Sequence, residues 1–159
     1  MKREETIDYN IKVAWHAISR LYNQYGQKFD VTASTGFVLL NIDVEKGTPA
    51  TKIAPLMGME ARSLTRMLKS MEEKKWIYRE PDPTDGRSVR IFLTELGQQK
   101  REFSRQAVRE FNNRMRNLVS EDKIKIFLEV AQTVTQLIEN KDLIDQMANS
   151  FMEEVPKSK

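Results

Sequence analysis

Residues 50–90 read ATKIAPLMGMEARSLTRMLKSMEEKKWIYREPDPTDGRSVR, and this stretch decides the fold. Its first part predicts a short helix over 51–57, a turn at Gly58 and a second helix over 61–75. A tip rich in Pro, Asp and Gly follows at 81–87, between two short runs that are typical of strands. We therefore predict a mainly α-helical protein in which a small β-hairpin, the wing, follows a helix-turn-helix.

The helix-turn-helix needs a small residue where its helices cross, and a residue that tolerates positive φ at the turn. Ala54 and Gly58 meet both needs four residues apart. Other tightly packed helical corners share this spacing, so it does not identify a DNA reader by itself. Steps of three and four then predict the core-facing stripe of the second helix: Leu64, Met67, Leu68 and Met71.

The outward face of the second helix is basic at its start. Arg62 and Arg66 have no acidic residue three or four positions away, and they repel each other at a cost of about 0.2–0.5 kcal/mol. Lys69 has Glu72 and Glu73 within reach. A merely solvated face more often mixes its signs, whereas a helix whose first half enters the major groove shows this bias. We favour the DNA-reading interpretation, because Arg contacts guanine or phosphate.

The tip of the wing contains Asp85, Gly86 and Arg87. We expect Gly86 to adopt an unusual φ, and the Asp85 carboxylate to bind Arg87 or the backbone amides of the turn. Pro81 and Pro83 are expected to end the strand pairing. An ordinary hairpin with a surface ion pair would show the same residues. Directly after a helix-turn-helix, an Arg at this tip instead suits the narrow minor groove of DNA.

Amphipathic helices flank this unit on both sides. An apolar stripe predicts a helix over 7–28 that ends or frays at Gly26, and the next helix is expected to begin at a cap on Thr32 or Ser34. Residues 46–49 are expected to be a turn between helices.

Two further helices are predicted after the wing. Thr94 is the expected cap of a long helix and Ser120 that of the next. The apolar stripe continues less regularly past Asn140, and 155–159 is expected to be a frayed tail.

The composition is that of an ordinary globular chain of 159 residues, with 31% charged and 40% hydrophobic residues, a net charge of +3 and no cysteine. Residues 45–101 carry twelve basic and eight acidic side chains, which resembles a nucleic-acid footprint. A chain without cysteine has no disulfide, thiolate metal site or thiol sensor. No apolar run approaches the ~18 residues of a membrane span, and the start lacks an apolar leader, so we expect a cytoplasmic protein that does not enter the membrane.

From about residue 30 to 99 the sequence resembles the MarR family of bacterial and archaeal transcription regulators. The likeness is most specific in a D-P-x-D-x-R wing and an L-T-x-x-G start of the following helix. The residues that carry it are 51–54, Gly58, 64–66, 71–77, 82–87 and 93–97.

The resemblance implies a single MarR-like domain over 1–159, with the winged helix-turn-helix at about 30–99 and dimerisation helices at 1–29 and 100–152. It implies a homodimeric repressor that binds a pseudo-palindromic operator in double-stranded DNA and responds to a small aromatic or anionic effector, whose binding residues are unassigned. No other cofactor and no metal are expected. The predicted DNA contacts are Arg62, Ser63, Thr65, Arg66, Lys69 and Arg87, with Asp85 and Gly86 supporting the wing.

Two positions depart from the family pattern. Glu60 stands where a capping residue such as Ser is common, so it caps less well and repels phosphate. Gly86 stands where a basic residue is common, so some affinity for the DNA backbone is lost. The alternative function is a winged-helix protein–protein module that has kept the fold without the DNA. Glu60 favours this alternative, and the unpaired Arg62 and Arg66 argue against it.

The roles of His16 and of four aromatic residues each have two interpretations, and a third function, that of an enzyme, is disfavoured. His16 either titrates as a pH sensor or is simply solvated, and we favour the second. Trp15, Tyr22, Tyr25 and Phe37 either line an effector pocket or pack in the core or dimer interface, and their helical spacing favours packing. An enzyme is improbable, because the sequence has no glycine-rich phosphate loop, no nucleophile–base signature and no cluster of metal ligands.

Overall fold

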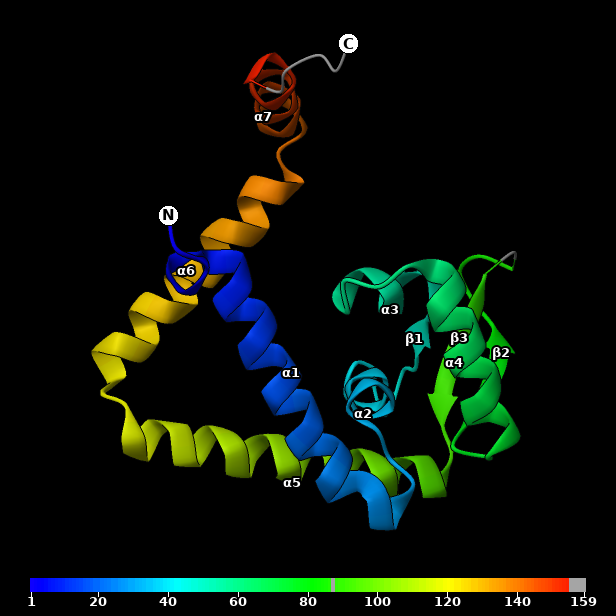
Figure 1. The fold of residues 1–159 in the computed structure, drawn as a ribbon. Coiled ribbons are helices and arrows are strands. Elements are labelled where there is room, and N and C mark those ends of the chain that lie inside the picture. Colours follow the sequence, from blue (N-terminus) through cyan, green and yellow to red (C-terminus); the bar gives the residue numbers. More distant parts are fainter. Residues whose placement is uncertain (87, 155–159) are drawn as a thin grey trace. The chain divides into compact units, whose positions relative to one another are not determined.

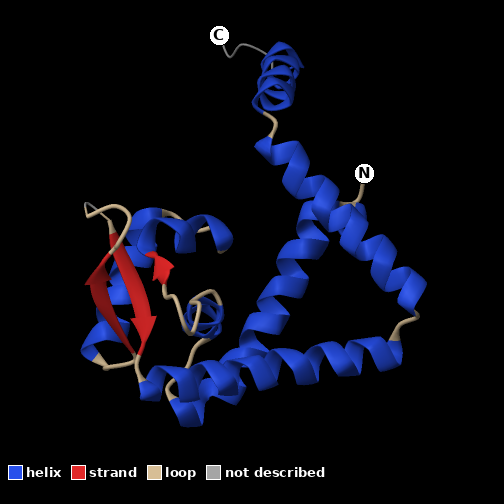
Figure 2. Ribbon diagram, turned by 180° about the vertical axis from the view of Figure 1, so that it is seen from behind, coloured by secondary structure: helices blue, strands red, loops and turns tan. Residues whose placement is uncertain are grey.

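A computed structural model describes residues 1–86 and 88–154 of the chain. Helices dominate, and one small antiparallel sheet accompanies them (Figures 1 and 2), so the predicted fold class is confirmed. The elements in chain order are η1 (Arg3–Glu5), α1 (Ile7–Gly26), η2 (Gln27–Phe29), α2 (Ala33–Leu40), β1 (Thr48–Pro49), α3 (Ala50–Leu56), α4 (Ala61–Glu73), β2 (Ile77–Pro81), β3 (Val89–Leu93), α5 (Glu95–Leu118), α6 (Glu121–Glu139) and α7 (Lys141–Glu154).

The chain divides into two compact units, Met1–Glu110 and Phe111–Lys159. The first unit contains the predicted helix-turn-helix and wing. Its core forms where α2, α3 and α4 meet the sheet, and the stripe predicted for α4 supplies Leu64, Leu68 and Met71 to it, with Met67 half-buried. The other main core residues are Val38, Leu39, Ile42, Ile53, Ala54, Trp76, Ile77, Ile91 and Leu93.

The wing is larger than the predicted hairpin. Its strands run in the order β1-β3-β2, and Thr48 of β1 pairs with Ile91 of β3. Residues 46–49, predicted as a plain turn, therefore include a strand. Pro81 was expected to end the ladder, but it still pairs with Val89 as the last residue of β2. Because β2 lies at the edge of the sheet, a residue without an N–H is tolerated there.

Local hydrogen bonds explain where the helices begin. Thr32 caps α2, since its Oγ1 accepts the Thr35 N–H at 3.1 Å, so the cap is Thr32 rather than Ser34. Thr94 caps α5 as predicted, because its Oγ1 accepts the N–H of Gly97 at 3.0 Å. Ser120 occupies the cap position of α6, but its side chain makes no capping hydrogen bond.

The end of α4 differs from the predicted residue 75. The helix stops at Glu73, and Lys75 adopts a left-handed φ of 58°. The Trp76 N–H then donates to the Met71 carbonyl at 2.9 Å, and the Lys75 N–H donates to the Glu72 carbonyl at 2.9 Å. This is a Schellman ending made without glycine. The burial of Trp76 and Met71 provides the hydrophobic contact that accompanies such an ending.

Trp76 is also the joint between the wing and α5. A Cβ on Gly97 would lie 1.9 Å from the Trp76 carbonyl oxygen, so only glycine allows this approach. The ammonium groups of Lys74 and Lys100 lie 5.1 and 5.5 Å from the indole ring centroid. Lys74 also pairs with Asp30 at 2.6 Å. These contacts fix the start of α5 against the winged helix-turn-helix.

The second unit consists of the end of α5 with α6 and α7. Apolar side chains along α6 lie largely exposed: the exposed fraction is 62% at Phe127, 47% at Leu128 and 63% at Ile138. Ile126 and Val130 add further exposed apolar area. Within the described residues, no helix combines the length and apolar character needed to cross a bilayer.

Candidate nucleic-acid interface

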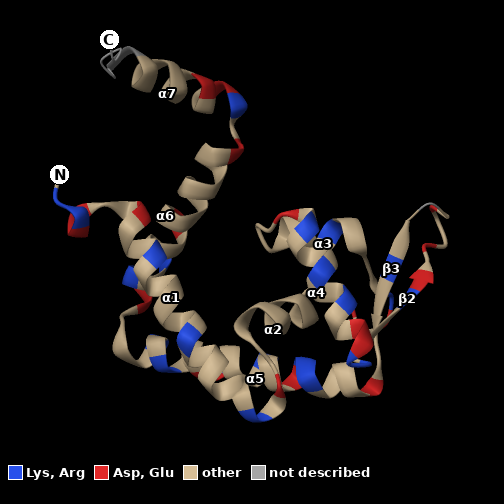
Figure 3. Ribbon diagram, turned by 45° about the vertical axis from the view of Figure 1, so that its right-hand side comes forward, with Lys and Arg blue, Asp and Glu red and all other residues tan. Residues whose placement is uncertain are grey.

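Helix α4 separates an apolar face from a basic face. Leu64 and Leu68 point into the core and are each 3% exposed. Four of the predicted DNA contacts lie on the exposed side, and Figure 3 shows the basic segments that run along this helix. They are Arg62, Thr65, Arg66 and Lys69. Ser63, the fifth predicted contact on α4, is also exposed.

The cations on this face are unpaired. Among the residues that the structure describes, none forms a hydrogen bond or ion pair with the side chains of Arg62, Arg66 or Lys69. Glu72 was expected to neutralise Lys69, but it pairs instead with Arg79 of β2 at 3.0 Å. The basic character therefore extends one turn further along α4 than the sequence predicts.

The first turn of α4 is uncapped by a side chain. Glu60 occupies the cap position with extended backbone angles, and it makes no capping hydrogen bond. The N–H groups of a helix's first turn, together with its dipole, favour an anion such as phosphate. The Thr65 hydroxyl donates to the Ala61 carbonyl at 2.8 Å, which leaves its oxygen lone pairs as the group available to a ligand.

Asp82, the first residue of the D-P-x-D-x-R motif, was not among the predicted site residues, and it holds the wing together. Its side chain is buried, and Oδ1 accepts the Thr84 N–H at 2.9 Å and the Thr84 hydroxyl at 2.6 Å. Its Oδ2 pairs with Arg90, whose Nη2 lies 2.9 Å away. These hydrogen bonds, first those from Thr84 and then that from Arg90, lower the pKa of Asp82 from 3.8 to about 2.

Arg90 connects the wing to the loop before β1. Its Nη1 donates to the backbone carbonyl of Lys46 at 3.0 Å while its Nε donates to Asp82 at 3.1 Å. The guanidinium of Arg90 therefore joins the base of the wing tip to the segment that leads into β1. The D-P-T turn followed by an Arg on the next strand was the sequence signal for this pair.

The predictions for the three residues at the tip of the wing compare differently with the structure. Asp85 is exposed, and its backbone carbonyl accepts the Ser88 N–H at 2.8 Å. Gly86 does not adopt the expected positive φ, and a Cβ there would meet open space. Arg87 lies outside the described residues, so its contact with DNA and with Asp85 stays a prediction. The main carboxylate of the wing is Asp82, because it lies at the buried base where the strands converge.

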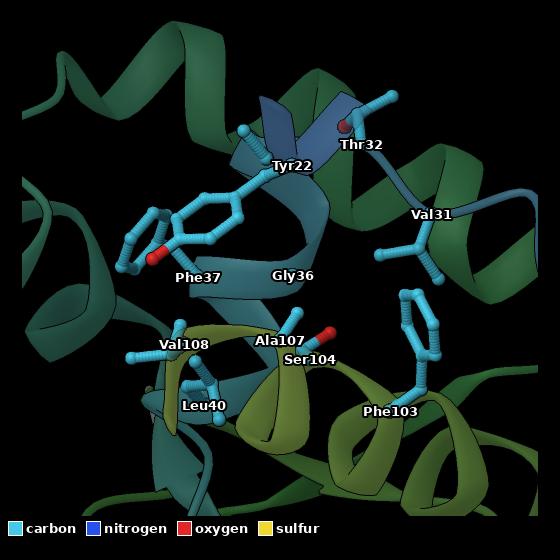
Figure 4. Close-up of a pocket in the computed structure, with 11 residues that line it drawn as sticks. Tyr22, Val31, Thr32, Gly36, Phe37, Leu40, Phe103, Ser104, Ala107 and Val108 are labelled. Carbon is cyan, nitrogen blue, oxygen red and sulfur yellow. The ribbon is translucent and has the colours of Figure 1, made fainter. Parts of the chain in front are cut away.

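A small cavity lies between α1, α2 and α5 (Figure 4). Its volume is about 20 Å³, which holds a water molecule rather than an aromatic ring. Tyr22 and Phe37, two of the predicted aromatic residues, line it together with Phe103 and Ser104. Gly36 allows α2 and α5 to approach each other closely beside the cavity, because a Cβ at this position would lie 3.0 Å from the Ser104 Oγ.

A larger hollow of about 420 Å³ opens beside α1 and α2. Trp15 and Phe37 line it, and their ring centroids lie 5.6 Å apart. Tyr25 is not among the residues that line either space. His16 is exposed on α1, in accordance with the solvated interpretation. In the described part of the chain, no group of three or more His, Cys, Asp or Glu residues is placed to hold a metal ion.

The order of helices and strands, with the basic face of α4 and the wing beside it, defines a winged helix-turn-helix protein. Residues 31–89 match the model of the MarR family. The HTH-type transcriptional regulator SarZ of Staphylococcus aureus (strain USA300) is 28% identical over 119 residues, which cover 66% of this chain and 80% of SarZ. The chain thus contains a region, residues 31–89, that matches the MarR family model, and it is similar to the regulator SarZ over 66% of its length.

Two solved structures of DNA-bound proteins are similar to this chain in fold. Reduced AbfR bound to DNA is 26% identical with a TM-score of 0.66, and the match covers 83% of this chain and 91% of AbfR. The transcriptional repressor CouR, bound to a 23-mer DNA duplex, has the same fold with a TM-score of 0.71 at 23% identity, over 83% of this chain and 94% of CouR.

Proposed function

We propose that this protein is a sequence-specific DNA-binding transcription regulator that represses its target promoter as a homodimer. The observation that carries the proposal is the face of α4 on which Arg62, Arg66 and Lys69 are exposed without an acidic partner among the residues that the structure describes. Three like charges left unpaired on one helix face repel one another, and this cost is offset when an anionic partner binds. The match of residues 31–89 to the MarR family model and the similarity to the DNA-bound proteins AbfR and CouR support DNA as that partner.

The substitution Arg66→Ala tests this directly. We expect it to weaken binding to the protein's own upstream DNA at least about fivefold, since a bidentate Arg contact with guanine is worth about 1–3 kcal/mol. Band shifts measure the affinity, and circular dichroism verifies the fold.

The matched control is Arg105→Ala, which removes the same charge from α5. Arg105 pairs with Glu102 at 2.8 Å and lies on the exposed side of that helix, so its loss should leave the DNA affinity within twofold. An equal loss in the two variants would show that only net charge matters and would sink the assignment of α4 as the reading helix.

The second unit, taken by itself, supports the proposed homodimer. Apolar side chains that remain exposed along α6 need a partner, and a second copy of the chain supplies one. Two α4 helices related by a two-fold axis would then meet successive major grooves. The operator is expected to be a pseudo-palindrome with half-sites about 10 base pairs apart.

Binding of a small molecule is proposed to lower the affinity of the protein for DNA. The hollow beside α1 and α2 supports this part of the proposal, because it opens next to the turn of the helix-turn-helix.

The second candidate function is a protein–protein module that does not bind DNA. Glu60 at the start of α4 favours it, since this carboxylate opposes phosphate where the helix N-terminus would attract it. Retention on heparin distinguishes the two candidates: a DNA-binding regulator elutes only at raised salt, whereas the protein–protein module passes through.

A further inference from the structure

Glu60 stands at the start of α4, the helix proposed to enter the major groove. Its backbone is fixed there, because the Glu60 carbonyl accepts the N–H groups of Ser63 at 3.1 Å and of Leu64 at 3.2 Å. Leu64 is anchored in the core with 3% of its surface exposed, whereas Glu60 is exposed. The N-terminal residues of a recognition helix are those that contact base edges. The Glu60 side chain therefore starts where α4 would meet the bases.

The carboxylate of Glu60 is a free hydrogen-bond acceptor. It does not cap α4, although residue 60 occupies the cap position with extended backbone angles (φ −68°, ψ 140°). The positions three and four residues further along, where a helical partner would stand, hold Ser63 and Leu64 rather than a cation. Among the described residues, none forms an ion pair or a hydrogen bond with the Glu60 side chain. An ionised carboxylate can only accept hydrogen bonds, so its ligand has to be a donor.

The charges on α4 argue for a base rather than a phosphate as the contact of Glu60. Arg62, Arg66 and Lys69 lie exposed on this helix without partners among the described residues, and they supply the attraction for the DNA backbone. A carboxylate placed against a phosphate would oppose that attraction. In the major groove, the donors that DNA presents are the amino groups of adenine and cytosine. Glu60 is thus suited to contact a base while the three cations bind the backbone or other bases.

Of the four bases, cytosine fits a single carboxylate best. The N4 amino group of cytosine donates in the major groove, and cytosine presents no acceptor there. Adenine places its N7 acceptor beside the N6 amino group, guanine presents two acceptors, and thymine presents an acceptor and a methyl group. A carboxylate has no proton to offer these acceptors, so each of the three other bases sets a lone pair or a methyl group against it. A contact from Glu60 would therefore discriminate in favour of cytosine.

We propose that Glu60 is a specificity-determining residue, whose carboxylate accepts a hydrogen bond from the N4 amino group of one cytosine in each half-site. The proposal rests on the proposed function, since it needs α4 in contact with duplex DNA. It also gives a role within DNA recognition to a carboxylate that otherwise favours the protein–protein module. If Glu60 only repelled phosphate, it would lower the affinity for every sequence alike and would select no base.

Selection from a pool of random DNA duplexes, with the full-length chain, identifies the base that Glu60 contacts. The unaltered chain should enrich cytosine at one position of each half-site. Glu60→Gln should favour adenine at that position, because an amide accepts from N6 of adenine and donates to N7. The preferences at the other positions should not change. The same preference at every position in the two proteins would overturn the proposal, and so would a change confined to positions where the unaltered chain does not select cytosine.

Glu73→Gln is the matched control, because it removes the same charge from the other end of α4. Glu73 is exposed, and it forms no ion pair with another residue that the structure describes. This variant should select the same sequences as the unaltered chain. If Glu73→Gln changed the base preference as Glu60→Gln does, the effect would belong to net charge and the role of Glu60 would be overturned. Circular dichroism verifies the helix content, which Glu60→Gln should preserve because Glu60 makes no capping hydrogen bond.

Titrations with two duplexes then measure the contact itself. One duplex carries the selected site, and in the other thymine replaces the cytosine, so that an acceptor stands in place of the N4 donor. The unaltered chain should bind the thymine duplex at least about fivefold more weakly, and Glu60→Ala should bind the two duplexes within about twofold of each other. An equal ratio of affinities in the two proteins would overturn the contact, even if Glu60→Ala bound both duplexes more tightly.

The selection also separates this proposal from the proposed function. A chain that selects no DNA sequence contradicts the proposed function, and the contact of Glu60 with it. A chain that selects one sequence equally well with and without the Glu60 carboxylate overturns the contact alone, and the proposed function stands.

Discussion

At the scale of single residues, Asp82 makes the clearest prediction about stability. Its pKa is lowered from 3.8 to about 2 in the folded chain, so the folded state binds fewer protons than the unfolded state between these values. The stabilisation from the carboxylate is therefore present above about pH 4 and is lost as the pH falls towards 2. We expect Asp82→Asn to unfold at lower denaturant concentration near pH 6, and this difference to shrink as the pH falls from 4 to 2.

Denaturant titrations of both proteins across that pH range measure the difference. Glu102→Gln is a comparison on α5, where the side chain of the carboxylate is 44% exposed beside Arg105 and a surface pair contributes little. A gap between Asp82→Asn and the unaltered chain that stays constant down to pH 2 would mean that the charge of Asp82 is not what stabilises the wing.

The contrast between Arg66 and Asp82 shows which residues the sequence could place. Helical periodicity fixes the face of a helix, so the exposed position of Arg66 followed from the buried stripe of Leu64 and Leu68. A wing tip has no such period. Asp82 and Asp85 look alike in the sequence, and only the convergence of β2 and β3 makes the first buried and the second exposed.

At the scale of elements, the close contact between Trp76, which follows α4, and Gly97 of α5 holds the wing against the start of α5. Gly97→Ala would place a methyl group 1.9 Å from the Trp76 carbonyl oxygen, so the backbone must shift. Overpacking of this kind costs about 1–3 kcal/mol. We expect a reduced melting temperature, measured by circular dichroism.

Gly86→Ala provides the matched control, because a Cβ at this position meets open space and the backbone there is not left-handed. It should leave the melting temperature unchanged or slightly raised, since alanine restricts the unfolded chain. Similar destabilisation of both variants would contradict the close packing of α5 against Trp76.

The same part of the fold also shows which features a sequence pattern cannot predict. A strand of two residues, such as β1, has too few positions for an alternating pattern, and its pairing with β3 depends on contacts distant in sequence. The end of α4 was misplaced because Lys75 takes a left-handed conformation that glycine usually occupies. The long helices α1, α4 and α5 were predictable because each carries many periods of its apolar stripe.

At the scale of the whole molecule, the exposed apolar face of α6 makes the oligomeric state testable. Phe127 is 62% exposed in the single chain, so Phe127→Asp should change the fold little and yet place a charge in a dimer interface. We expect sedimentation to show monomers at concentrations where the unaltered protein is dimeric. Glu129→Asp, a charge-conserving change on the same helix, should remain dimeric.

In the proposed homodimer, two-fold symmetry would determine how salt acts on the protein–DNA complex. Each phosphate contact lowers the slope of log K against log salt by about 0.9, and in a dimer each contact occurs twice. Arg62 lies in the first turn of α4, where the helix N-terminus favours phosphate. Arg62→Ala should therefore reduce the steepness of the salt dependence by about 1.8, and by only about half as much in the monomeric Phe127→Asp background. Affinities measured over a series of salt concentrations give both slopes, and a loss near 0.9 in the unaltered background would contradict a symmetric pair of reading helices.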